Sequence, residues 1–217
     1  MMMTPTTSDA LIADLVCDLE PVRPLRFGAG MAGTLAAAGL SAAVVIGLLG
    51  LRPDWLAGSV NPMHLVATGL FGVLGLAATV TVIVMSRPQV GSDHSGWRWA
   101  AGMAALLPLA GLIVAMGRGR AVLAEATMRH GAECFAAGGL ASLLALAVLT
   151  AWLRRGAPTA PARAGLVAGV AAGAFGAFAF SLHCPDNDIV HLGIWHSMAV
   201  LAMAGLGRVL VPRLIRW

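Results

Sequence analysis

The sequence predicts an all-α, polytopic membrane protein with six transmembrane helices and a short cytoplasmic amphipathic helix at the N-terminus. Hydrophobic residues make up 59% of the 217 positions, only 11% are charged, and the mean hydropathy is +0.84. Such values are typical of integral membrane proteins. Apolar runs of about 20 residues, the length that crosses a bilayer, recur along the chain. The predicted spans are Phe27–Leu51, Met63–Ser86, Trp99–Met116, Ala132–Leu153, Ala162–Leu182 and Ile189–Val211.

The tail before the first span, residues 1–26, is predicted to carry the amphipathic helix. Apolar side chains recur at helical spacing between residues 9 and 19, opposite acidic ones, with Ser8 as N-cap and Pro21 as the stop. An acidic helix is repelled by anionic lipid and suits the groove of a protein partner, although a passive leader helix is the alternative. The candidate partner-binding residues are Asp9, Leu11, Ile12, Leu15, Val16, Asp18, Leu19, Pro21 and Val22.

The remaining residues, 27–217, form the predicted transmembrane domain. In its fifth span, Gly165, Gly169 and Gly173 recur every four residues, a pattern that lets helices approach closely in lipid. The pattern favours packing within the bundle, with a homo-oligomer through these glycines as the alternative.

Arginine placement predicts the orientation, because all 14 basic residues are Arg. Ten of them lie in the tail, the second and fourth loops and the C-terminus, so the positive-inside rule puts both termini in the cytoplasm. In a bacterial inner membrane, the third and fifth loops then face the oxidising outside. The basic charge reports topology and lipid contact, and we expect no direct binding to nucleic acid.

The external loops concentrate side chains that bind metals or undergo thiol chemistry. Cys134 and Cys184 could form a disulfide, bind a thiophilic ion such as zinc or cadmium, cycle as a redox sensor, or be inert. No cofactor is expected to be obligatory. His196 either bonds a neighbouring helix or lines a pocket below Cys184, and Asp188 could orient His191 from the same helix face. The candidate sensor residues are Cys134, Cys184, His183, His191, His196, Asp186, Asp188 and His130.

The sequence lacks the usual enzyme signatures. It contains no Gly-rich phosphate loop, nucleophile elbow or His-Glu-x-x-His motif, and we expect no enzyme. No carboxylate lies at membrane depth in the predicted spans, which weakens a transporter interpretation.

Four motifs together resemble the NrsF-type family of negative regulators of sigma-F. They are Asp9-Ala10-Leu11-Ile12-Ala13-Asp14-Leu15, Asp18-Leu19-Glu20-Pro21-Val22-Arg23-Pro24-Leu25, His183-Cys184-Pro185-Asp186-Asn187-Asp188 and Ile194-Trp195-His196, with Cys134 in the place of the family's other cysteine.

The resemblance implies a membrane-bound anti-sigma factor. Its tail would sequester a sigma factor of the extracytoplasmic-function type, and Cys134 and Cys184 would sense heavy metal or oxidative stress and trigger release. The alternative from the residues alone is a membrane thiol redox or metal-handling protein that uses the same Cys/His cluster.

Overall fold

The computed structural model describes residues 6–17, 24–88, 95–118 and 125–215, and in these ranges it contains helices and turns but no strand. Six of the described helical segments are long and apolar enough to cross a bilayer, consistent with a multi-pass membrane protein, and the all-α prediction is confirmed. The elements are α1 (Thr6–Cys17), α2 (Phe27–Leu49), α3 (Pro53–Ala57), α4 (Pro62–Met85), α5 (Gly96–Arg118), α6 (Glu125–Arg155), α7 (Pro161–Ser181), α8 (Ile189–His191), a π-helical turn (Leu192–His196) and α9 (Ser197–Leu214).

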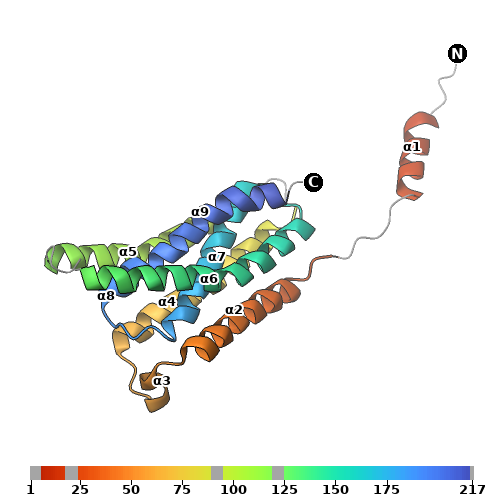
Figure 1. Ribbon diagram of the computed structural model, residues 1–217. Coiled ribbons are helices and arrows are strands. Elements are labelled where there is room, and N and C mark those ends of the chain that lie inside the picture. The colour runs from red at the N-terminus through yellow and green to blue at the C-terminus, as the bar shows by residue number, and fades with distance from the viewer. Residues whose placement is uncertain (1–5, 18–23, 89–94, 119–124, 216–217) are drawn as a thin grey trace.

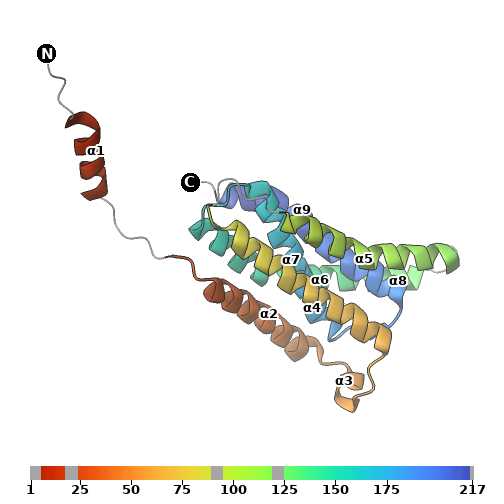
Figure 2. The same cartoon turned by 180° about the vertical axis from the view of Figure 1, so that it is seen from behind.

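Helix α7 is the centre of the bundle, and α4, α6 and α9 pack around it (Figures 1 and 2). Its small residues allow this close approach. A Cβ atom at Gly169 would collide with the backbone of Met203 on α9, and one at Gly173 would lie 2.7 Å from the Cα of Val200. Gly165 packs against α9 in the same way, so the structure favours the intramolecular alternative: these three glycines are buried and do not form a surface for a second copy.

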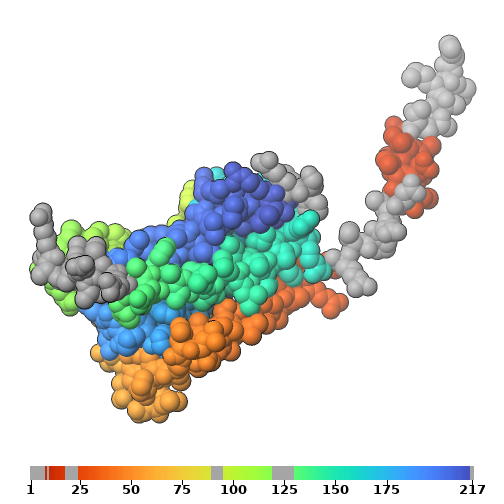
Figure 3. Space-filling view, viewed as in Figure 1, coloured from red at the N-terminus to blue at the C-terminus, as the bar shows by residue number. Residues whose placement is uncertain are grey.

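Helix α2 lies at the edge of the bundle, where Figure 3 shows it as an outer ridge beside α6. It contacts α6 and α7, and only 28% of its most apolar stretch is buried. An apolar groove of about 430 Å³ separates part of α2 from α6, and another of about 400 Å³ lies between α2 and α4. Helix α2 is therefore far less constrained by packing than α7.

The bundle has two chemically different ends. The start of α2 and the end of α9 lie at one end, and α3, α8 and the start of α6 lie at the other (Figure 1). Helix α6 begins at Glu125, seven residues before the predicted start of the fourth span, because a helix can continue beyond the hydrocarbon into polar surroundings. This extension adds His130 to the polar end.

The sixth span contains one feature that the sequence did not predict. The wide turn over 192–196 replaces an ordinary α-helical turn at the point where the span passes α5. Gly193 permits the contact, since a Cβ there would lie 2.6 Å from the carbonyl oxygen of Leu107. Turns of this kind are rare and occur frequently at functional sites.

The tail helix α1 begins at Thr6, so Ser8 lies inside its first turn and is not the N-cap. Its apolar side chains Leu11, Ile12, Leu15 and Val16 are 57–60% exposed. The candidate residues Asp18, Leu19, Pro21 and Val22 lie outside the described part of the chain.

Candidate metal and thiol site

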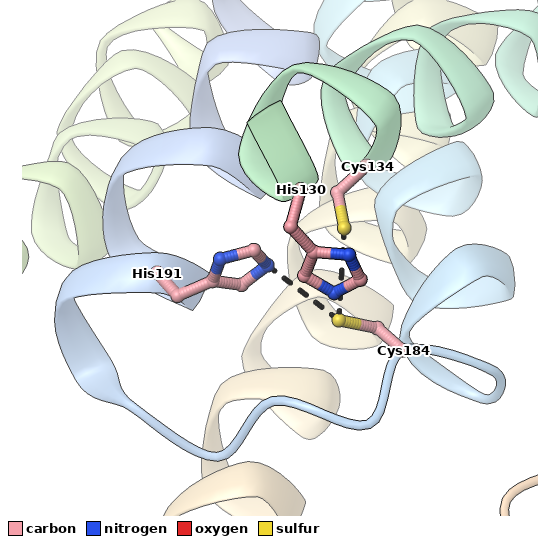
Figure 4. A group of neighbouring side chains, drawn as sticks. All are labelled: His130, Cys134, Cys184 and His191. Atoms are coloured by element: carbon pink, nitrogen blue, oxygen red, sulfur yellow. Dashed lines mark hydrogen bonds between the residues drawn. The ribbon is translucent and has the colours of Figure 1, made fainter. Parts of the chain in front are cut away.

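Four potential metal ligands meet at the polar end of the bundle. His130 and Cys134 project from α6, four residues apart and therefore on one helix face. Cys184 follows α7, and His191 ends α8. One ligand atom from each of the four lies within 4.8 Å of all the others (Figure 4). Cys134, Cys184 and His191 are almost completely buried, whereas the side chain of His130 is partly exposed at the outer edge.

Two of the spacings between these atoms match those of tetrahedral coordination. Around zinc, with bonds of about 2.3 Å to sulfur and 2.0 Å to nitrogen, tetrahedral angles separate two sulfurs by about 3.8 Å and a sulfur from a nitrogen by about 3.5 Å. Cys134 Sγ and Cys184 Sγ are 3.8 Å apart, and Cys184 Sγ is 3.5 Å from His191 Nε2. The two sulfurs are not bonded as a disulfide, and the donor set of two cysteines and two histidines suits a thiophilic divalent ion.

Asp186 faces the other side of the His191 ring. Its Oδ2 lies 3.4 Å from His191 Nδ1, and its Oδ1 accepts a 2.8 Å hydrogen bond from the backbone N–H of Asp188. A carboxylate behind a histidine fixes the ring so that Nε2 points toward a metal. The prediction that Asp188 orients His191 is therefore wrong: the Asp188 carboxylate pairs with Arg118 at 2.7 Å on the surface.

His196 lies below the cluster and bonds a neighbouring helix. Ser181 Oγ donates to the carbonyl of Ala177, so at 3.0 Å it accepts from His196 Nδ1. With this assignment, His196 Nε2 carries a lone pair. This atom is buried and has no hydrogen-bond partner. The His196 ring also meets that of His191 edge to face, with centroids 5.6 Å apart. The first alternative for His196, a hydrogen bond to a neighbouring helix, thus describes its position.

The electrostatic surroundings of Cys184 favour its thiolate form. The hydrogen bond with Cys134 lowers the pKa of the Cys184 thiol, and the contact with His191 lowers it further, against the opposing effect of burial. The thiolate is the form that binds metals. Cys184 is therefore prepared for ligation.

His183 lies outside this cluster, contrary to the expectation that it would contribute to it. Its Nδ1 donates to the carbonyl of Gly50 at 3.0 Å, and its ring meets the edge of Phe180. His183 thus connects the loop of residues 182–188, which we call the Cys184 loop, to the end of α2.

Arg52 and His64 complete the surroundings of the Cys184 loop, and the sequence interpretation missed both. Arg52 is only 5% exposed, and its NH1 donates to His64 Nδ1 at 2.9 Å and to the carbonyl of Cys184 at 2.6 Å. His64 Nε2 in turn donates to the carbonyl of Ser181 at 3.0 Å. Asp54 forms a two-pronged ion pair with Arg52, which lowers the pKa of the Asp54 carboxyl group.

The chain is similar to known proteins of one family. The family model described as "Negative regulator of sigma F", NrsF, matches residues 15–217. The chain is 34% identical over 221 residues to the Anti-sigma-F factor NrsF of Caulobacter vibrioides, and the match covers 100% of both chains. It is 30% identical over 186 residues to a protein of Azospira oryzae named Probable anti-sigma-F factor NrsF, covering 80% of this chain and 82% of the other. No solved structure matches the chain.

Proposed function

The chain belongs to the NrsF family of negative regulators of sigma F, and from this premise we propose a complete signalling path. The protein is a membrane-bound anti-sigma factor of the bacterial inner membrane, with both termini in the cytoplasm. Its tail sequesters a sigma factor of the extracytoplasmic-function type. Ligation or oxidation of Cys134 and Cys184 on the outer side releases that sigma factor, so the protein has a regulatory role and not an enzymatic one.

The tail is supported as the binding element by the exposed apolar side chains of α1. Leu11, Ile12, Leu15 and Val16 follow helical spacing and are more than half exposed, while Asp14 adds negative charge. An exposed apolar stripe on a short helix suits the hydrophobic groove of a protein partner. The acidic surroundings favour a partner whose groove has a basic rim.

A thiophilic divalent metal ion is the stimulus that the site geometry supports best. The single observation that carries this proposal is the cluster of His130, Cys134, Cys184 and His191, whose ligand atoms lie within 4.8 Å of one another. A metal ion can enter between donors that are already suitably spaced. Bound there, it would supply a positive charge that holds two thiolates and two imidazoles together.

Oxidation is the second stimulus, and it requires more movement. An oxidant that accepts two electrons would join Cys134 Sγ to the Cys184 thiolate as the Cys134 thiol proton leaves. The sulfurs are 3.8 Å apart, and a disulfide bond is about 2.05 Å long. Cys134 on α6 and Cys184 in its loop would therefore have to approach each other, whereas a metal ion would sit between sulfurs at about their present separation.

The test uses the purified full-length chain in detergent together with its sigma factor and Cd²⁺. We expect one Cd²⁺ per chain, seen as a thiolate-to-metal charge-transfer band, and loss of the bound sigma factor on metal addition. The variant Cys134→Ser/Cys184→Ser should retain the sigma factor with or without Cd²⁺ and lose the band. Cys17→Ser, which alters the exposed tail cysteine, is the matched control and should behave as wild type.

Two outcomes would contradict the proposal. Normal release in the double variant would refute the role of the two cysteines as sensors. A sigma factor that binds equally well to a chain lacking residues 1–26 would refute the role of the tail.

A further inference from the structure

Arg52 is a buried cation whose hydrogen bonds join separate parts of the molecule. A guanidinium has five N–H donors, and each finds an acceptor here. Two contact the Asp54 carboxylate and one contacts His64 Nδ1. The other two reach the Cys184 loop, at the carbonyl of Cys184 and, at 2.9 Å, at Asn187 Oδ1. Full satisfaction of a buried arginine makes the contact strong and geometrically specific.

Two more hydrogen bonds attach the Cys184 loop to the chain that follows α2. The backbone N–H of Arg52 donates to the carbonyl of Leu182 at 3.1 Å, and the His183 ring donates to the carbonyl of Gly50 at 3.0 Å. Gly50 immediately follows α2. The residue that carries the Cys184 thiolate is therefore fastened to the outer end of α2 through both backbone and side chains.

The opposite end of α2 begins at Phe27, where the tail ends. Along its length, α2 is lightly packed and is flanked by the two apolar grooves described above. Leu40 and Val44 line the groove toward α6, and Leu35 and Gly39 line the one toward α4. A helix with few close protein contacts on either side can shift as a rigid rod at a lower cost than a close-packed helix such as α7.

We propose that Arg52 is the positioning residue that couples the Cys/His site to α2, and through α2 to the tail. The inference rests on the proposed function and adds the route by which the stimulus reaches the sigma factor. A metal ion bound by Cys184 would fix the backbone of that residue, including the carbonyl that accepts a hydrogen bond from Arg52. Arg52 then selects the position of the outer end of α2, and the rigid helix carries that change to residue 27. Coupling of this kind requires that the metal favour one of two α2 positions.

The test separates metal binding from metal-driven release. Arg52→Lys keeps the charge beside Asp54 but removes the fork that reaches Cys184 and Asn187. Asn187→Ala weakens the grip of the Arg52 side chain on the loop by removing one of its two main contacts there, and it leaves the pairs of Arg52 with Asp54 and His64 intact. The matched control is Arg118→Gln, which removes the exposed arginine at the end of α5 that pairs with Asp188 of the same loop and leaves the contacts of the loop with the end of α2 unchanged.

For each full-length variant, Cd²⁺ occupancy is read from the charge-transfer band and sigma-factor affinity is measured with and without saturating Cd²⁺. We expect wild type and Arg118→Gln to lose affinity by about tenfold or more, a typical coupling between two sites. Arg52→Lys and Asn187→Ala should bind one Cd²⁺ per chain and the sigma factor normally, yet change affinity by less than about twofold on metal addition.

Normal release by both coupling variants at full occupancy would overturn the inference and leave the proposed function standing. Loss of Cd²⁺ binding in Asn187→Ala would also overturn it, because Arg52 would then serve ligation and not coupling. Equal loss of release in Arg118→Gln would show general loop disturbance and would likewise overturn it. If the wild-type chain keeps its sigma factor when loaded with Cd²⁺, the proposed function itself fails, and this outcome is distinct from the others.

Discussion

Asp186 and Asp188 are chemically identical residues two positions apart, and their surroundings give them different roles. Asp186 faces His191 Nδ1, whereas Asp188 pairs with the exposed Arg118. We predict that Asp186→Asn weakens Cd²⁺ affinity by about 10- to 100-fold, the usual effect of losing the carboxylate behind a metal-binding histidine. The asparagine oxygen can still accept the Asp188 N–H, so the loop should keep its shape.

Competition titration with a metal chelator measures this effect. Asp188→Asn is the matched control and should change the affinity by no more than about twofold, because an exposed ion pair contributes little. Equal weakening in the two variants would argue against a specific role for Asp186.

Residue types and helical spacing were sufficient to nominate the four clustered donors, because soft ligands are rare in this chain and were expected on one face of the membrane. They could not distinguish Asp186 from Asp188, since that choice depends on α8 beginning at Ile189 with Asp188 directed outward. Nor could they find Arg52. Its role depends on a loop about 130 positions later in the sequence returning to the end of α2, and local patterns carry no such information.

At the scale of elements, α1 carries the first prediction. Replacing Leu11 and Leu15 by Ala removes two exposed leucines and keeps a good helix former. Each buried leucine contributes about 1.5–3 kcal/mol to an apolar contact, so sigma-factor affinity should fall by at least about 100-fold. A titration of the purified full-length protein with its sigma factor measures this affinity. Ala13→Ser on the same helix is the control, and an unchanged affinity in the leucine variant would exclude α1 as the binding element.

A second prediction at this scale concerns the contact between α7 and α9. Gly169→Ala places a methyl group against the backbone of Met203, which should destabilise the bundle by about 1–3 kcal/mol. Thermal unfolding in detergent should show a lower midpoint. Gly205→Ala on α9 meets open space and should leave the midpoint unchanged or raise it slightly. A similar midpoint for both variants would contradict the close packing of α7 against α9.

The six spans were predictable because bilayer thickness imposes a minimum apolar length. Each predicted span corresponds to one continuous helical segment of the structure, the sixth of which contains the π-helical turn. Their ends were less predictable. The five-residue helix α3 is too short to leave a periodic signal, and the π-helical turn depends on how Gly193 meets Gly111 across two spans. Such contacts between distant segments are visible only after folding.

At the scale of the whole molecule, an even number of spans would put the tail and the C-terminus on one side, and the arginine distribution predicts that this side is cytoplasmic. In the Cys134→Ser/Cys184→Ser background, Cys17 is the only thiol in the chain. A membrane-impermeant maleimide should label it in inside-out vesicles and not in intact spheroplasts. If only spheroplasts were labelled, the topology would be the opposite of the predicted one, and the Cys/His site would face the cytosol.

The π-helical turn divides the sixth span into two parts that make different contacts. The half before Ser197 presents His191 and His196 to the site, and the half after it fits the glycines of α7. One additional residue in a helix rotates everything beyond it by about 100° unless a wider turn absorbs the change. The wide turn absorbs this rotation. A single inserted residue can therefore add a metal donor on the Cys184 side of the turn while the contacts between α9 and α7 stay in register.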